Sequence, residues 1–148
     1  NFYAIFSIMA KFSAQVSDFT KDSKHAMQRV NQSAIQSLTN DVVSDTPKVT
    51  GNASWSWLGT TDAMPPIREG GVEFQSSNAT SVAIMGLKSG ETFYFGAQAA
   101  YMARLNYGFT GTDKLGRTYN QTGIGWIERR AEEWPSYVKA AENKFKVK

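Results

Sequence analysis

One segment of the sequence comes close to a phosphate-binding pattern. Residues 111–118 read G-T-D-K-L-G-R-T, near the G-x-x-x-x-G-K-[ST] loop whose backbone N–H groups, lysine and hydroxyl hold a nucleotide and its magnesium ion. Arg117 stands where that loop has its lysine, and the turn-like residues 119–123 stand where a helix must begin at once. A chain this short offers no second metal-binding strand. We therefore expect no nucleotide site here.

Other residue types that support catalysis are present, but their arrangement is unfavourable. Glu128, Glu132 and Glu133 could form a carboxylate pair for acid–base chemistry, but two arginines stand among them, which favours a solvated, salt-bridged helix face. His25 is the single histidine and the chain has no cysteine, which excludes a His-rich metal site, a thiolate metal site, a disulfide and a cysteine nucleophile. We expect no enzyme, no cofactor and no metal.

The charge distribution favours a binding role in the last third of the chain. At 148 residues, with 41% hydrophobic and 20% charged residues, the chain fits a single domain over 1–148. From Arg104 onward there are nine Lys and Arg against five Asp and Glu, whereas before it there are seven against eight. This surplus can steer an acidic partner, but it lacks the dense basic cluster of a nucleic-acid-binding surface. A small basic nucleic-acid-binding domain is kept as the alternative from another class.

The first residues are apolar but do not predict a membrane protein. The run N-F-Y-A-I-F-S-I-M-A is far shorter than the ~20 residues that a membrane-spanning helix needs. It also lacks the positively charged start of a signal peptide. The sequence from Met9 to Lys11 resembles a natural start. We expect residues 1–11 to be an N-terminal extension, and no membrane to be involved.

Two helices are expected near the ends of the chain. Apolar residues recur every three or four positions over 12–44, but the spacing slips between Phe19 and Ala26. We therefore expect a helix over 21–44, preceded by a strand or an extension. Pro47 ends this helix, because the residue before a proline is pushed out of the helical region.

The C-terminal helix is expected to begin near residue 125. From Ile127 to Phe145 the apolar positions step by 4, 3, 4, 3 and 4. Glutamates lie early in this stretch and lysines late, which complements the helix dipole. Because a proline inside a helix removes one backbone hydrogen bond, we expect a kink just before Pro135.

The central part of the chain predicts a small sheet. Residues 53–58 alternate Trp and Ser, as in a half-exposed strand. Residues 81–85 and 92–97 also read as strands, joined by a hairpin turn at 87–91, and residues 72–75 suit a short edge strand. The predicted class is α+β, with a small antiparallel β-sheet of three to four strands covered by the long N-terminal helix and the C-terminal helix.

Residues 108–125 are expected to form a long Gly-rich arm. The segment is polar, has no periodicity and contains five glycines, and loops this long are usually functional or disordered. Its aromatic residues argue against disorder. We predict an ordered or partner-ordered arm between the compact stretch 97–107 and the last helix. The candidate contacts with other protein copies or partners are Tyr101, Arg104, Tyr107, Phe109, Lys114, Arg117 and Tyr119.

The segment over 94–123 reads Y-F-G-A-Q-A-A-Y-M-A-R-L-N-Y-G-F-T-G-T-D-K-L-G-R-T-Y-N-Q-T-G. It resembles the phage tail-component family of lambda-like siphophages, the HK-type head–tail joining or tail-completion proteins. The Pro-x-x-Thr-Gly turn at 47–51 and the box from Tyr101 to Gly108 match that family in order and spacing. Two departures stand out. Asn106 replaces an acidic residue, and the pair at 52–53 replaces Leu-Arg.

The resemblance implies a non-enzymatic structural virion protein at the head–tail junction, made in the host cytoplasm. Such proteins form rings, commonly of six copies, around the channel through which DNA passes without sequence-specific binding. The implied partners are other copies of the chain, the neighbouring neck or stopper protein, and the tail terminator or tail tube. A tail-completion (neck) protein and a tail terminator ring that caps the tube both stay open. We expect the arm over 108–125 to contact a neighbouring subunit or an adjacent ring.

Overall fold

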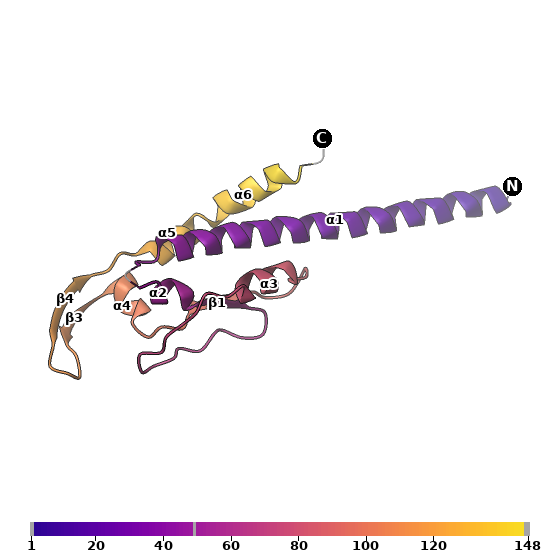
Figure 1. Ribbon diagram of the computed structural model, residues 1–148. Coiled ribbons are helices and arrows are strands. Elements are labelled where there is room, and N and C mark those ends of the chain that lie inside the picture. Colours follow the sequence, from indigo (N-terminus) through magenta and orange to yellow (C-terminus); the bar gives the residue numbers. More distant parts are fainter. Residues whose placement is uncertain (1, 49, 147–148) are drawn as a thin grey trace.

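A single long helix dominates the molecule. The computed structural model describes residues 2–48 and 50–146, and α1 (Phe2–Asp45) runs through 44 of them. Its C-terminal half lies along the rest of the protein, whereas its N-terminal half extends well beyond it (Figure 1). Within the described ranges, no helix combines the length and the apolar character needed to cross a membrane.

The N-terminal half of α1 corrects one expectation. No strand or boundary precedes residue 21, because α1 is continuous through residues 12–20. Val16 and Phe19 lie on this projecting part and are exposed, Phe19 to 74%. The described side chains of residues 11–22 are all exposed, so the slip in apolar spacing borders a part of the helix that has no buried face to keep in phase.

The end of α1 follows the expectation from Pro47. The helix stops at Asp45, and the buried Thr46 hydroxyl donates a hydrogen bond to the Val42 carbonyl at 2.8 Å. The same hydroxyl accepts the Trp57 indole N–H at 2.9 Å. The helix terminus is therefore fixed to the chain segment that follows it.

The predicted strand over 53–58 is only partly correct. Residues Asn52–Trp55 form a short helix, α2, and the strand β1 begins later, at Trp57–Thr60. Gly51 enters the helical turn with a left-handed φ of 90°, and the Ser54 hydroxyl donates to its carbonyl at 2.8 Å. The serines that suggested an exposed strand face instead bond to backbone carbonyls of the turn, which stabilises helical geometry.

The predicted strand over 81–85 is wrong, because these residues belong to helix α3 (Ala79–Met85). The hairpin turn at 87–91 is therefore also wrong, and residues 72–75 carry no strand. The Gln32 side chain of α1 donates to the carbonyls of Met85 at 3.2 Å and Leu87 at 2.9 Å. A short apolar run does not distinguish strand from helix by itself, and here contacts with α1 favour the helix.

The α+β class is confirmed, with four antiparallel strands. They form two separate two-stranded sheets and not one continuous sheet. In the first, β1 pairs with β2 (Tyr94–Ala97), so that Trp57 lies opposite Ala97. In the second, β3 (Gly108–Thr112) pairs with β4 (Thr118–Thr122). Because α3 takes the place of a middle strand and contacts β1, the first sheet cannot grow further on that side.

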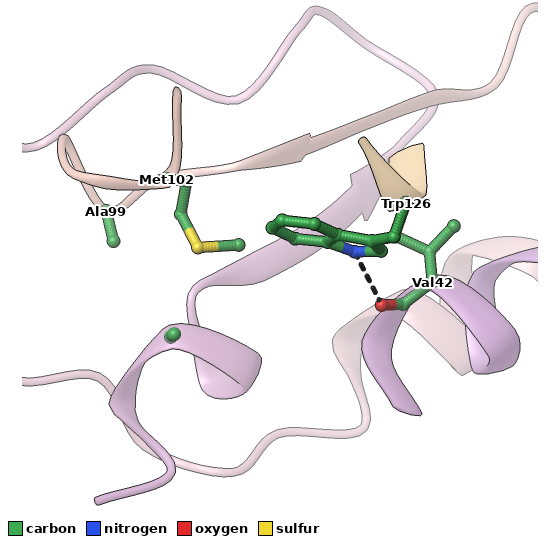
Figure 2. Packing of buried hydrophobic residues seen from close by; sticks show 5 residues of the cluster. Val42, Ala99, Met102 and Trp126 are labelled. Carbon is green, nitrogen blue, oxygen red and sulfur yellow. Dashed lines mark hydrogen bonds between the residues drawn. The ribbon is translucent and has the colours of Figure 1, made fainter. Parts of the chain in front are cut away.

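Trp126 is the centre of the hydrophobic core. Its side chain has no exposed surface and lies in one cluster with Val42, Ala99 and Met102 (Figure 2) and with Ala53 of α2. These residues come from α1, from α2 and from the segment 99–102. Its indole N–H donates to the Val42 carbonyl at 3.2 Å, so the one polar atom of the ring is satisfied. Burying a tryptophan this fully contributes a large share of the stability of a small domain.

The C-terminal helix is divided as expected. Helix α5 (Trp126–Glu132) ends immediately before α6 (Trp134–Lys144), and Pro135 lies in the first turn of α6, where its missing N–H removes no hydrogen bond. The predicted kink before Pro135 is therefore confirmed. Helix α6 packs along α1 and, with α5, brings the end of the chain back onto the long helix (Figure 1).

Candidate assembly surface

The predicted arm is a regular β-hairpin. Strands β3 and β4 are joined by a three-residue loop over 114–116, with Gly116 at a left-handed φ of 77°. The N–H of Gly116 donates to the Asp113 carbonyl at 3.0 Å, and the N–H of Asp113 donates to the Arg117 carbonyl at 2.9 Å. This is a type I turn closed by a glycine bulge, one of the common hairpin connections. The expectation of a loop without periodicity is wrong for residues 108–122.

One face of the hairpin carries a row of two aromatic rings flanked by two cations. The Arg104 guanidinium of α4 (Met102–Tyr107) lies 4.0 Å from the centre of the Phe109 ring. That ring lies 5.8 Å from the Tyr119 ring, and the Arg117 guanidinium lies 6.0 Å from the centre of the latter. Cation–π contacts at this exposure contribute about 0.5–1 kcal/mol each. The row connects α4 to the hairpin tip.

Asp113 holds the tip together. Its carboxylate accepts the backbone N–H groups of Leu115 and Arg117, each at 2.9 Å, and the Arg117 side chain at 2.7 Å. The Tyr119 hydroxyl donates to it at 3.2 Å. The hydrogen bond from the Arg117 backbone N–H is the main reason that the pKa of Asp113 falls to about 2. The N–H groups that a phosphate would need are therefore bonded to a carboxylate of the same loop.

Asn106 fixes the root of the hairpin to the core. It is 2% exposed, and its amide donates to the Glu128 carboxylate at 2.6 Å while its side-chain oxygen accepts the Ile127 N–H at 3.2 Å. A Cβ on Gly123 would lie 2.4 Å from the Asn106 backbone oxygen, so the end of α4 and the residue after β4 approach too closely there for any larger residue. The hairpin therefore leaves the body from a rigid base.

Glu128 takes part in this base through its carboxylate. A hydrogen bond with the Tyr107 hydroxyl, and then the bond from Asn106, lower the pKa of Glu128. The same hydrogen bond with Glu128 raises the pKa of Tyr107, whose side chain is 71% exposed. Glu133 lies elsewhere, 3.0 Å from Arg130. The expected salt-bridged face is thus present for Glu133, whereas Glu128 faces the hairpin root.

The structure gathers four of the seven predicted contact residues: Arg104, Phe109, Arg117 and Tyr119. The other three lie apart from this row. Lys114 is exposed in the loop at the tip, and Tyr107 lies at the root. Tyr101 precedes α4 and accepts a hydrogen bond from the Asn52 amide at 3.3 Å, which places it beside α2.

Sequence reasoning missed Asp113 and Asn106. The signal for Asp113 was available, since an Asp followed three residues later by Gly, between runs of Thr and aromatic residues, is a hairpin pattern. No comparable signal marks Asn106. Its role depends on Ile127 and Glu128, which are more than 20 residues away in the sequence and meet it only in the fold.

A second polar cluster ties the helices together. Arg130 contacts Asp45 at 2.6 Å, Glu133 at 3.0 Å and Asp41 at 3.6 Å, while the Tyr137 hydroxyl donates to Asp41 at 2.6 Å. The Asp45 hydrogen bond is the main cause of the raised pKa of Arg130. Burial, with the bond to Asp41, raises the pKa of Tyr137 to about 12. These contacts join α1 to α5 and α6.

One hollow of the structure has few titratable groups in its lining. A hollow of about 470 Å³ lies beside α1, α2 and α3, and its described lining contains one titratable residue, Lys48, among serines, threonines and aromatic rings. Within the described ranges, no group of three or more metal-ligating side chains comes together. Acid–base catalysis needs at least one positioned titratable group beside the substrate and usually a second.

Comparison with protein-family models, with curated proteins and with solved structures gives no match for this chain.

Proposed function

We propose that this protein is a structural component of a phage particle at the head–tail junction. It works as a ring of several copies around the DNA channel and joins the tail to the head. The observation that carries the proposal is the β3–β4 hairpin, which projects from the body at the end opposite to the N-terminus of α1 (Figure 1). The resemblance of residues 94–123 to the HK-type tail-completion proteins agrees with it.

The hairpin has the properties of an arm that contacts other protein chains. Its root is rigid, because Asn106 and the closely packed glycines hold both strands to the core. Beyond the root, Thr110, Thr112 and all of β4 except Tyr119 are exposed. A two-stranded hairpin is at best marginally stable in water, so one that stands away from a body is expected to gain stability from a partner.

The test is removal of the arm. Residues 110–122 are deleted, which leaves a short connection because the backbones of Gly108 and Gly123 already touch. We expect the shortened chain to keep its folded body and to fail to join tails to heads when it replaces the intact chain during phage growth. The measurement is the yield of infectious particles, with free heads and free tails counted by electron microscopy.

A matched control separates loss of the arm from loss of the fold. Leu115→Ser changes an exposed residue of the hairpin loop and keeps both strands, and we expect it to support normal yields. Infectious particles at normal yield from the shortened chain would refute the proposed role of the arm. A labelled chain found away from the head–tail junction in intact particles would refute the proposed location.

A further inference from the structure

We infer that copies of this chain join by strand addition, the β3 edge of one hairpin pairing antiparallel with the β4 edge of the next. The inference rests on the proposed ring, and it names the backbone edge, not the aromatic row, as the contact between copies. It would form a continuous sheet with two strands from each copy.

The hairpin has two edges with free hydrogen-bonding capacity. In an antiparallel pair, residues with bonds directed at the partner strand alternate with residues whose N–H and C=O groups point outward. Asp113 and Arg117 form a bonded pair, so the alternation places outward-pointing groups at Thr110 and Thr112 on β3 and at Thr118 and Asn120 on β4. Within the described ranges, no third strand pairs with either edge.

The edges also lack the features that protect strands from pairing. Proteins usually blunt an exposed edge with a charged residue, a proline or a bulge in the strand. The ten residues of β3 and β4 include no charged residue and no proline, while six of them are Thr, Phe or Tyr, which favour strands. The bulge is confined to the loop at Gly116. Such an edge is a template for another strand.

The chemistry of the two edges is complementary. Inside one hairpin, Thr110 lies opposite Asn120 and Thr112 lies opposite Thr118. The same types of residue would face each other between two copies. Thr–Thr neighbours are favourable cross-strand pairs, and within the hairpin the Thr110 hydroxyl already donates to the Asn120 side chain at 3.4 Å. All four side chains are exposed.

The geometry favours head-to-tail pairing over a two-fold dimer. When β4 pairs antiparallel with the β3 of a neighbour, all hairpin tips point the same way and each copy keeps one edge for the next neighbour. Pairing of β4 with β4 points the two tips in opposite directions and stops at two copies. A contact that uses different surfaces on the two partners is the kind that closes into a ring.

Two proline variants test the inference, one on each edge. Thr110→Pro removes an outward N–H from β3, and Asn120→Pro removes one from β4, without loss of a backbone hydrogen bond inside the hairpin. Each also removes the exposed side-chain hydrogen bond from Thr110 to Asn120 at 3.4 Å, which the valine controls below remove as well. We expect the unmodified chain to form closed oligomers, each variant alone to be monomeric, and an equal mixture of the two to form dimers and nothing larger. The mixture stops at dimers because the intact β4 edge of Thr110→Pro pairs with the intact β3 edge of Asn120→Pro. The two outer edges of such a dimer are both blocked by proline. Native mass spectrometry measures all three.

The controls keep the backbone donor and remove the polar side chain. Thr110→Val and Asn120→Val should assemble as the unmodified chain does. Proton–proton contacts between the Phe109 and Tyr119 rings, measured by nuclear magnetic resonance, check that each proline variant keeps its hairpin. If a proline variant loses these contacts, Thr110→Lys or Asn120→Lys replaces it, since a lysine on an edge strand also blocks pairing.

The outcomes also separate this inference from the proposed function. Proline variants that assemble normally, or an unmodified chain that stays monomeric up to its solubility limit, overturn strand addition, and loss confined to one variant overturns the head-to-tail geometry. Edge-dependent oligomers that never enter phage particles leave strand addition standing and remove the head–tail role. If phage particles contain the chain and both proline variants still support their assembly, the head–tail role stands and strand addition is overturned.

Discussion

The two sheets of this protein have the same number of strands and the same antiparallel pairing, but different surroundings. The β1–β2 sheet belongs to the body, where the Trp57 and Phe95 rings stack at 4.7 Å and the Thr80 hydroxyl of α3 accepts the Gly59 N–H at 2.9 Å. The β3–β4 hairpin contacts the body mainly at its root. Contacts with other elements hold the first sheet, whereas turn chemistry and a local aromatic row hold the second.

This difference predicts two separate responses to mutation. Changes around β1–β2 should lower the stability of the whole domain, because they alter packing that the sheet shares with the core. Changes in the hairpin should act locally, because few of its contacts reach the core.

The largest loss of stability is expected from a change at Trp126, the fully buried side chain of the core. Trp126→Ala removes a fully buried ring that packs with Val42 and Met102, and we expect the free energy of unfolding to fall by about 3–5 kcal/mol. Urea denaturation followed by circular dichroism measures it. Leu115→Ala at the exposed hairpin tip is the control and should change that free energy by no more than about 0.5 kcal/mol. Equal effects would contradict the assignment of Trp126 to the core.

The next effect concerns the joint between the two regions. Asn106→Ala leaves the Ile127 N–H and the Glu128 carboxylate without their buried partner, which should cost about 1–3 kcal/mol. Urea denaturation gives the global value, and hydrogen exchange shows whether β3 and β4 open more often. Asn120→Ala, an exposed asparagine in the hairpin, is the matched control. A hairpin whose exchange is unaffected by Asn106→Ala would show that its root is held elsewhere.

Two glycines distinguish packing from backbone conformation. A Cβ at Gly59 would lie 2.4 Å from the Phe93 ring and 2.8 Å from the Thr80 methyl group, so Gly59→Ala should cost about 1–3 kcal/mol through overpacking of the body. Gly116 has open space around its Cα but a positive φ, so Gly116→Ala should cost about 1 kcal/mol, confined to the hairpin.

Substitution by asparagine tells these two causes apart. Asparagine tolerates left-handed backbone conformations, so Gly116→Asn should be milder than Gly116→Ala. At Gly59 the larger side chain should make the defect worse. Denaturation measures the stability of the Gly59 variants and hydrogen exchange that of the Gly116 variants. If Gly59→Asn were more stable than Gly59→Ala, that would contradict the packing explanation.

A smaller effect is expected from the aromatic row. Arg104→Ala removes the guanidinium over the Phe109 ring, which should lower the local stability of the hairpin by about 0.5–1 kcal/mol. Hydrogen exchange at Gly111 and Tyr119, which form a bonded pair, reports this, while global unfolding should hardly change. Lys114→Ala removes a charge at the tip and should leave the exchange of that pair as it is.

The smallest effect is a pH dependence confined to the tip. Because the folded pKa of Asp113 is about 2, below its ordinary 3.8, its stabilising effect is complete above the ordinary value and is lost as the pH falls through about 2. The amide resonances of Leu115 and Arg117 should shift in that window. They should not do so in Asp113→Asn. A transition in both chains would assign the shift to another group.

Part of the fold was readable from the sequence because local rules decided it. The end of α1 before Pro47 and the break before Pro135 follow from the geometry of proline, which acts wherever the residue stands. The α+β class and a helix near each end of the chain were also predictable. The helix over 81–85 was not, because a run of four apolar residues after Ser81 fits a buried strand and a helical turn equally well.

The candidate surface was only partly predictable for the same reason. Arg104, Phe109, Arg117 and Tyr119 were among the seven contacts expected from the sequence, but the approach of the Phe109 ring to the Tyr119 ring depends on the pairing of β3 with β4. The pairing of Gly108 with Thr122 and the role of Asn106 depend on contacts that the chain makes only after folding. A glycine-rich, polar segment suggested a loop, although its threonines and aromatic residues favour strands.

The sequence by itself determined the absence of cysteine chemistry, the positions of the two proline breaks and the glycine-containing turn, since each depends on residue type and near neighbours alone. Only the tertiary structure decided that residues 79–85 are a helix and that four strands form two sheets. It also decided that the Asp113 carboxylate accepts backbone N–H groups of the loop whose sequence comes close to a phosphate-binding pattern. Contacts of α3 with α1 and β1 settle the first, the pairing of β1 with β2 and of β3 with β4 settles the second, and the closing of the hairpin settles the third.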